Sequence, residues 1–288
     1  MTQIHDIDIR NLTKTYGEIT AVAGIDLAVK RGEIFALLGP NGAGKTTTVE
    51  ILEGYRKKSS GDISVLGADP SAFTSINHER EWREKVGIVL QTLSNSFGDL
   101  TVAETVHHYA KFYSQPRNPE FTIEEVGLSD KRDEKIRTLS GGQRRRLDVA
   151  LGIIGNPQLL FLDEPTTGFD PEARRAFWLL IRKLRDEGTT ILLTTHYLEE
   201  AEALADRVAV IVAGKIVDIA TPATLGNRHQ SLTEVSYFHH GQRQVINTAT
   251  PTAEIARLSG EFSGEIPELI VKRPTLEDIY LQMIGNQS

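Results

Sequence analysis

The segment Gly39–Thr46, with the sequence GPNGAGKT, has the residue types and spacing of a loop that binds the phosphates of a nucleotide. In such a loop the backbone N–H groups surround phosphate oxygens, a lysine neutralises their charge and a hydroxyl holds Mg²⁺. Lys45 and Thr46 occupy the lysine and hydroxyl positions. The alternative is a glycine turn that only joins a strand to a helix, but such a match arises by chance in roughly one chain of this length in a hundred.

Two adjacent carboxylates, Asp163 and Glu164, follow the apolar residues 159–162 in the segment LLFLDEP. Neighbouring side chains of a strand point in opposite directions, so one carboxylate can lie beside a metal while the other faces an attacking water. Taken alone, such a segment is more often a strand that leaves the core, because charged residues commonly mark strand ends. Its occurrence together with the phosphate loop favours the functional interpretation.

His196 directly follows the apolar segment 189–195. Ligands of open α/β sheets bind beyond the carboxyl ends of the strands, so we expect the phosphate loop, the two carboxylates and His196 to converge. A lone histidine is usually structural or merely exposed, and only its place in the chain favours a functional role here. The pairs His107–His108 and His239–His240 are interpreted as solvated histidines rather than metal ligands.

A second glycine motif, LSGGQ at residues 139–143, precedes a helix-spaced apolar stripe formed by Leu147, Ala150, Leu151 and Ile154. Ser140 or Gly141 would then start a helix, where free N–H groups attract anions. The arginines at 144–146 oppose the helix dipole but add positive potential at the same end. The alternative is a serine-capped surface helix with a solvated arginine face, and the sequence leaves both open.

The elements that must position these residues alternate between strand and helix, which predicts a mostly parallel sheet. Strands are expected at 4–12, 25–29, 34–38, 62–66, 159–162, 189–195 and 208–212, and helices at 47–55, 171–187 and 197–205. A helical pattern at 101–126 predicts a helical insertion. The segment 226–231 (GNRHQS) is interpreted as a linker, so domains are expected at 1–228 and 229–288, the second with short strands and a final helix at 276–284.

The composition excludes several classes of protein. A net charge of −7 and a pI near 5.7 argue against a protein that binds nucleic acid by general electrostatic attraction. The chain has no cysteine, which excludes disulfides, thiolate metal sites and cysteine nucleophiles. Its longest uncharged central segment, 149–162, is shorter than the roughly 20 apolar residues that span a bilayer, and the N-terminus lacks the apolar core of a signal peptide. We therefore expect no transmembrane segment.

Together these motifs resemble the nucleotide-binding subunit of an ATP-binding cassette (ABC) transporter over about residues 4–225. The matches, in family order, are the phosphate loop, the glutamine loop at Gln91, the signature 139–143, the strand 159–165, the D-loop 168–170 and the switch histidine His196. The resemblance implies an α/β P-loop NTPase cassette: a mixed sheet core, an antiparallel β subdomain and a helical subdomain at about 91–140, followed by a small α+β C-terminal domain.

The resemblance also implies roles for single residues. ATP phosphates would be held by Gly39, Pro40, Asn41, Gly42, Ala43, Gly44, Lys45, Thr46 and Thr47, and Mg²⁺ by Thr46, Gln91 and Asp163. Glu164 would act as the general base on water and His196 would contact the γ-phosphate, since phosphoryl transfer requires positioning and charge stabilisation. In the family two cassettes pair head to tail, so Ser140, Gly141, Gly142 and Gln143 would close on ATP held by the other chain. The implied site also includes Asp170 and Tyr16, the second as the residue that stacks on adenine. The Tyr16 assignment is the weaker one, because a tyrosine at a strand end commonly serves only in packing.

The C-terminal segment 273–281 (RPTLEDIYL) and the residues 166–175 resemble the drug and antibiotic exporter subgroup that includes daunorubicin-resistance ATPases. This implies ATP-driven export of a drug, antibiotic or lipid-like cargo through a separate integral-membrane permease contacted near 91–113. It also implies a second ATPase subunit, so that the protein is expected as a homodimer, with a heterodimer left open. The dimer is expected at the cytoplasmic face of the membrane. Phe169 departs from the family, which more often has leucine there.

The other hypothesis is a soluble ATPase of the same superfamily that acts on ribosomes or DNA. Ribosome-acting relatives usually carry two cassettes in one chain, and chromosome-structuring ones insert long coiled coils before the signature. This chain has one cassette and a short insertion, so we expect no nucleic-acid partner. An ordinary phosphate-loop kinase would not account for the signature or for Glu164 beside Asp163.

Overall fold

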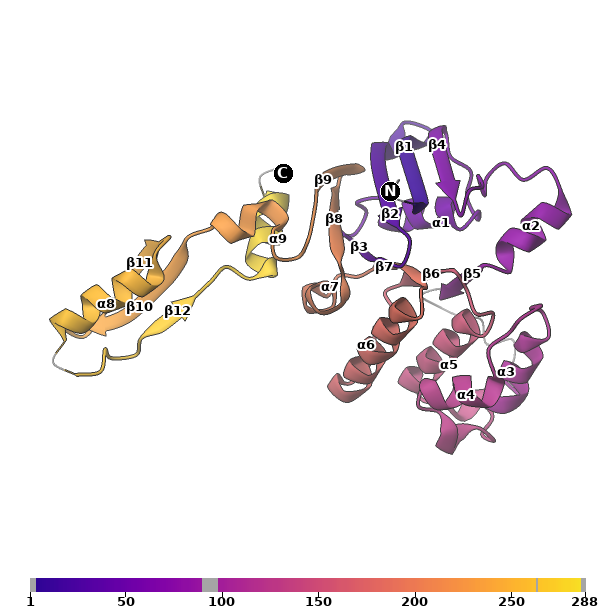
Figure 1. The fold of residues 1–288 in the computed structure, drawn as a ribbon. Coiled ribbons are helices and arrows are strands. Elements are labelled where there is room, and N and C mark those ends of the chain that lie inside the picture. Colours follow the sequence, from indigo (N-terminus) through magenta and orange to yellow (C-terminus); the bar gives the residue numbers. More distant parts are fainter. Residues whose placement is uncertain (1–3, 90–97, 263, 286–288) are drawn as a thin grey trace. The chain divides into compact units, whose positions relative to one another are not determined.

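The computed structural model describes residues 4–89, 98–262 and 264–285 (Figure 1). The chain divides into two compact units, residues 1–219 and 220–288, and each is described here by itself. The described part of the first unit contains a six-stranded sheet, a three-stranded antiparallel sheet and a helical segment. These are the parts of the α/β cassette that the sequence predicts, and the fold class is confirmed.

The six-stranded sheet has the order β5-β6-β7-β3-β8-β9. Its strands are β3 (Ile34–Leu38), β5 (Val86–Val89), β6 (Leu159–Asp163), β7 (Thr190–Thr194), β8 (Arg207–Val212) and β9 (Lys215–Ala220). The pairs from β5 through β8 are parallel. Because both faces of β3 and β7 are buried, these strands are almost continuously apolar rather than alternating.

Helices connect the parallel strands and begin or end next to the carboxyl edge of the sheet. They are α1 (Lys45–Leu52) after β3, α5 (Gly141–Ile153) before β6, α6 (Pro171–Asp186) after β6 and α7 (Leu198–Leu204) after β7. Asp170 caps α6 by accepting a hydrogen bond from the Ala173 N–H at 2.8 Å, and Pro171 fits the first turn. The sheet and its connecting helices therefore place the motif-bearing loops along one edge.

The antiparallel sheet consists of β1 (His5–Tyr16), β2 (Ile19–Lys30) and β4 (Ser60–Val65), in the order β2-β1-β4. Its alternating apolar residues, such as Ile7 and Ile9, share one core with Phe35, Leu37 and residues of α1. This sheet thus packs on the same core as the phosphate loop's strand and helix.

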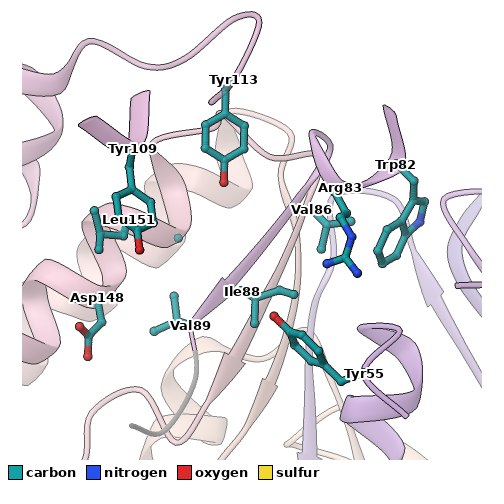
Figure 2. A pocket seen from close by; sticks show the side chains of 11 residues that line it. Tyr55, Trp82, Arg83, Val86, Ile88, Val89, Tyr109, Tyr113, Asp148 and Leu151 are labelled. Atoms are coloured by element: carbon teal, nitrogen blue, oxygen red, sulfur yellow. The ribbon is translucent and has the colours of Figure 1, made fainter. Parts of the chain in front are cut away.

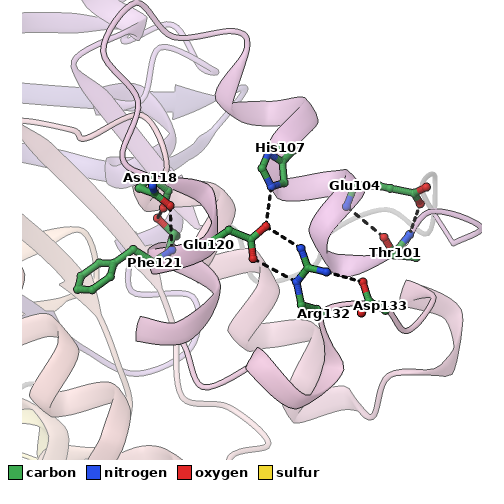
Figure 3. A network of polar contacts seen from close by, with 9 residues as sticks. Thr101, Glu104, His107, Asn118, Glu120, Phe121, Arg132 and Asp133 are labelled. Atoms are coloured by element: carbon green, nitrogen blue, oxygen red, sulfur yellow. Dashed lines mark hydrogen bonds and ion pairs between the residues drawn. The ribbon is translucent and has the colours of Figure 1, made fainter.

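The helical segment contains α3 (Val102–Ala110), α4 (Pro119–Glu125) and the short helices η2 (Ser129–Lys131) and η3 (Ile136–Thr138). A separate helix, α2 (Ile76–Arg83), precedes β5 and packs on the main core through Trp82. The helical pattern expected over 101–126 is two helices, because Pro116 interrupts it and Asn118 caps a new helix by accepting from the Phe121 N–H. Glu120 of α4 joins α3 and the segment after η2 through His107 at 2.8 Å and Arg132 at 2.8 Å (Figure 3). Polar contacts therefore hold this segment together at its surface.

The second unit contains a sheet of order β11-β10-β12, formed by β10 (Thr233–His239), β11 (Gln242–Thr248) and β12 (Ile270–Lys272). Its helices are η4 (Leu225–Gln230), α8 (Pro251–Glu261) and α9 (Leu276–Gly285). The linker expected at 226–231 is wrong: η4 packs on α9 so closely that a Cβ on Gly226 would lie 2.5 Å from Ile279. The domain boundary inferred between residues 228 and 229 stays a prediction.

Glu53 is a buried carboxyl at the end of α1, with 2% of its surface exposed. Burial, with smaller contributions from the charges of Asp163 and Glu50, raises its pKa from 4.5 to about 8. An acid whose pKa is raised by folding binds more protons in the folded state, so the protein loses stability as pH rises between the two pKa values. We therefore expect Glu53 to be largely protonated at neutral pH.

Glu53→Gln should remove much of the loss of stability that occurs as pH rises toward about 8. Between pH 6 and pH 9 the wild-type free energy of unfolding should fall by about 2–3 kcal/mol more than that of the variant. Urea unfolding of the nucleotide-free full chain at both pH values measures this difference. Glu18→Gln, at an exposed position, is the matched control and should keep the wild-type slope; equal slopes in wild type and Glu53→Gln would contradict the assignment.

Candidate active site

The carboxyl ends of β6, β7 and β3 bring the chemical groups of the site together, because β7 lies between the other two strands. Asp163, the last residue of β6, is paired with Thr194, the last residue of β7. β3 leads directly into Gly39, and His196 follows β7 by two residues. The phosphate loop, the two carboxylates and the histidine therefore leave neighbouring strands at the same edge.

Two glycines of the phosphate loop, Gly39 and Gly44, lie too close to neighbouring backbone atoms to be replaced by a residue with a side chain. A Cβ on Gly39 would lie 2.3 Å from the Ile211 carbonyl oxygen, and one on Gly44 would lie 2.4 Å from that of Ala21. Gly44 also has a left-handed backbone with φ of +104°, which favours glycine. The loop then enters α1, whose first turn presents N–H groups that have no helical acceptor and suit a phosphate.

Lys45 lies inside this loop with only 7% of its surface exposed. Its Nζ donates to the carbonyl oxygens of Gly39 at 2.7 Å and Pro40 at 3.1 Å. Burial lowers the pKa of the Lys45 ammonium, while the nearby charges of Glu164 and Asp163 act to raise it. A fixed, half-desolvated donor at this point suits a phosphate oxygen.

The two carboxylates have different surroundings. The Thr194 hydroxyl donates to Oδ1 of Asp163, which fixes this carboxylate across the β6–β7 pair. The Glu164 carboxylate instead lies 3.2 Å from Nδ1 of His196, whose side chain is 45% exposed. The His196 ring also packs against Tyr197, with 4.0 Å between the ring centroids. The structure thus joins Glu164 and His196 in one pair and leaves Asp163 with a hydroxyl partner.

The signature residues start α5 and form a capping box. Ser140 accepts from the Gln143 N–H at 3.3 Å, and the Ser140 N–H donates to Oε1 of Gln143 at 2.8 Å. Ser140 and Gly141 are exposed, while Gly142 and Gln143 are half-buried. The signature therefore presents a serine-capped helix start at the surface of the single chain.

The three arginines that follow the signature bind backbone carbonyls of their own chain. Arg144 donates to Arg137 at 3.0 Å and Arg146 to Gly127 at 2.9 Å. Arg145 is 6% exposed and donates to three carbonyls of residues 163–165. The interpretation as a solvated arginine face is therefore wrong for Arg145, which sequence reasoning did not connect with the carboxylates.

The remaining expected residues lie around this centre or outside the described part of the chain. Tyr16, at the end of β1, is 40% exposed and carries the Lys14 ammonium 4.9 Å from its ring centroid. Phe169 is 6% exposed, and its ring packs edge-on against Phe177, with 5.9 Å between the ring centroids. The phenylalanine that replaces the family's leucine therefore packs inside its own chain. Gln91 lies outside the described residues, and its role stays a prediction.

Comparisons with known proteins agree with this arrangement. The ABC transporter family model matches residues 22–167. The chain is 38% identical over 309 aligned residues to "Nod factor export ATP-binding protein I" of Ralstonia nicotianae, covering 98% of this chain and 94% of that protein. A solved "ATP binding subunit of ABC transporter" has the same fold, with a TM-score of 0.70 at 21% identity over 96% of this chain and 98% of that chain.

A second solved structure is a dimeric ATP-binding cassette in a post-hydrolysis state, bound to ADP and Pi. It has a TM-score of 0.67 and 25% identity, and the match covers 75% of this chain and 98% of that chain. The family model spans half of the chain, and the curated relative, which is named an ATP-binding protein, matches nearly all of it. The chain therefore belongs to the ATP-binding subunits of ABC transporters and is an ATPase of that family.

Proposed function

We propose that this chain hydrolyses ATP to power export through a separate integral-membrane permease. The observation that carries the proposal is the meeting of Lys45, Asp163 and the Glu164–His196 pair at one edge of the sheet. Export is supported by the Ralstonia nicotianae relative and by a 33% identical Rhizobium relative, both named for Nod factor export. The cargo class is a drug, antibiotic or lipid-like molecule, in keeping with the subgroup resemblance of residues 273–281.

Mg²⁺ fits the donor set of the site. The Thr46 hydroxyl and the Asp163 carboxylate are oxygen ligands of the kind that this hard cation prefers, and Gln91 would add an amide oxygen. Bound there, Mg²⁺ neutralises charge on the phosphate oxygens. The Thr194 hydroxyl holds Asp163 in one orientation, so the carboxylate is set before the cation arrives.

Glu164 acts as the general base in this proposal. Its contact with Nδ1 of His196 orients the imidazole and leaves Nε2 for the γ-phosphate of ATP. Lys45 and the backbone N–H groups of residues 41–47 hold the phosphates in line with the water that Glu164 deprotonates. The chain thereby supplies orientation, a proton acceptor and positive charge, which are the requirements of phosphoryl transfer.

A second ATPase subunit completes each site. The exposed helix start at Ser140 and Gly141 offers N–H groups to a phosphate held by another chain. The dimeric cassette solved with ADP and Pi supports an assembly of two cassettes. The complete motif set of this chain is consistent with a homodimer that has two equal sites.

The permease would dock in a pocket of about 270 Å³ beside α3 and α5. Figure 2 shows Tyr55, Tyr109 and Tyr113 around this pocket, with Arg83 and Asp148 on its walls. Aromatic walls with a few charges suit a short amphipathic helix of the partner.

No helix in the described ranges is long and apolar enough to cross a bilayer. Because its relatives are ATP-binding subunits named for export, we place this chain as a peripheral subunit on the cytoplasmic face of the membrane.

Glu164→Gln should abolish turnover without abolishing nucleotide binding. Loss of the proton acceptor should lower steady-state kcat by about 100-fold or more, while binding of a fluorescent ATP analogue stays within about twofold. Glu172→Gln, at an exposed position in the first turn of α6, is the matched control and should turn over normally. Wild-type turnover by Glu164→Gln would refute the general-base role.

A mixed dimer tests whether the signature acts on the other chain's ATP. One copy carries Lys45→Ala and the other Ser140→Arg, so one composite site keeps an intact loop and an intact signature. This dimer should retain about half of the wild-type turnover if the two sites work independently. The control pairs a wild-type copy with a copy carrying both changes, which leaves no intact composite site and should be inactive. Equal activities of the two dimers would contradict action between chains.

Affinity purification from solubilised membranes tests the transport role. The tagged full chain should recover a polytopic membrane protein, and Tyr109→Glu in the docking pocket should reduce this recovery by placing a charge among the aromatic residues. Thr46 and the rest of the loop are untouched by this change, so nucleotide binding should be unaffected. Recovery of ribosomes in place of a membrane protein would favour the other function.

A further inference from the structure

Arg145 joins the signature helix α5 to the loop that carries the catalytic carboxylate of the same chain. Its Nε donates to the Pro165 carbonyl at 3.0 Å. Its Nη2 donates to the carbonyls of Asp163 at 2.6 Å and Glu164 at 3.2 Å. One planar guanidinium thus binds three consecutive carbonyls, a geometry that the single ammonium of a lysine cannot reproduce.

The backbone held by Arg145 is one that needs support. Glu164 has a left-handed backbone with φ of +46°, which costs a residue with a side chain on the order of 1 kcal/mol. On its N-terminal side the Glu164 N–H donates to the Thr194 carbonyl at 3.1 Å, which ties it to β7. On its C-terminal side the Glu164 and Pro165 carbonyls are held by Arg145. The Glu164 carbonyl also accepts the Thr167 N–H at 3.3 Å, and the carboxylate contacts His196. The backbone of Glu164 is therefore held by β7, by this turn and by Arg145.

Asp148 balances the buried guanidinium from the next turn of α5. Its Oδ2 lies 3.9 Å from Nη1 of Arg145, and the two side chains are 13% and 7% exposed. Burial raises the pKa of Asp148 to about 6 and Arg145 opposes that shift, so the carboxylate is largely ionised at pH 7.5. A buried charge without a partner is costly, so Asp148 stabilises Arg145 in its place.

The arginines beside Arg145 show that its bonds are not a general property of the helix start. Arg144 and Arg146 also bind carbonyls, but those of Arg137 and Gly127, far along the chain from residues 163–165. Between residues that the structure describes, the hydrogen bonds of Arg145 reach the catalytic loop, whereas those of Arg144 and Arg146 go to Arg137 and Gly127. Arg146 therefore offers a matched control at the same helix end.

We propose that Arg145 is a positioning residue for Glu164, which it aims by fixing three carbonyls of the catalytic loop, and that Asp148 holds Arg145 in place. The proposal rests on the proposed role of Glu164 as general base. Arg145 touches neither ATP nor water in this role and acts only through the backbone of Glu164.

The first test compares Arg145→Met, Arg145→Lys and Asp148→Asn with Arg146→Met in the purified full chain. Misplacement of the base should lower kcat by about 10- to 100-fold in Arg145→Met and by less in the other two. KM for ATP and binding of a fluorescent ATP analogue should stay within about threefold, because the phosphate loop is unchanged. Arg146→Met should keep kcat near the wild-type value. If Arg145→Met does not fold, the other two variants decide, and wild-type kcat in both would overturn the proposal.

The second test is a double-mutant cycle with Glu164→Gln. A residue that acts only through Glu164 has nothing left to position once the base is gone, so Arg145→Met should not lower the residual turnover of Glu164→Gln further. Independent losses that multiply would show a general structural role and overturn the proposal. If Glu164→Gln alone turns over normally, the general-base role itself fails. This outcome can be told apart from failure of the Arg145 proposal, in which Glu164→Gln has a reduced kcat and Arg145→Met lowers it further.

Discussion

The arrangement of the site depends on the hydrogen bond between the Thr194 hydroxyl and the Asp163 carboxylate. It joins the last residues of two neighbouring parallel strands, and Thr194 also accepts the N–H of Glu164 through its carbonyl. Thr194 thus fixes the Asp163 carboxylate at the end of β6 and also holds the backbone at Glu164, where the following loop begins. Because β3 is the other neighbour of β7, the phosphate loop follows from the same strand order.

Buried charge is arranged around this edge in both signs. The Lys45 ammonium, the Arg145 guanidinium and the Asp163 carboxylate each find backbone or hydroxyl partners rather than relying on each other alone. Glu53 lies at the end of α1 and has a pKa raised to about 8, mainly by burial. Its carboxyl is therefore largely protonated at neutral pH and adds little negative charge to the site. The site therefore keeps fixed donors and acceptors in a desolvated region, where electrostatic interactions with a substrate are strong.

The sequence predicted most of the strands and helices with regular patterns, but it missed the short strands β5 and β9 and the helix α2. The helix α2 has one buried residue, Trp82, whose Nε1 donates to Val65, so its sequence INHEREWR has no apolar stripe to detect. The Arg145 contacts were missed for a different reason. The apolar stripe of α5 suggested one buried face, whereas this helix is buried on most sides and Gly152 would place a Cβ 2.4 Å from Val89. Only tertiary packing decides which arginine of residues 144–146 is buried.

The capping box at the start of α5 has an energetic consequence for association. Ser140 and Gln143 already satisfy each other's N–H groups, so a phosphate that binds either of these two groups must replace an existing hydrogen bond, whereas the Gly141 N–H in the first turn has no helical acceptor. Exchange of one such hydrogen bond for another changes the free energy by on the order of 1 kcal/mol or less. In the proposed pairing of two cassettes, the contacts at Ser140 and Gln143 would therefore add little free energy to the interface, which would help it to form and separate once per turnover.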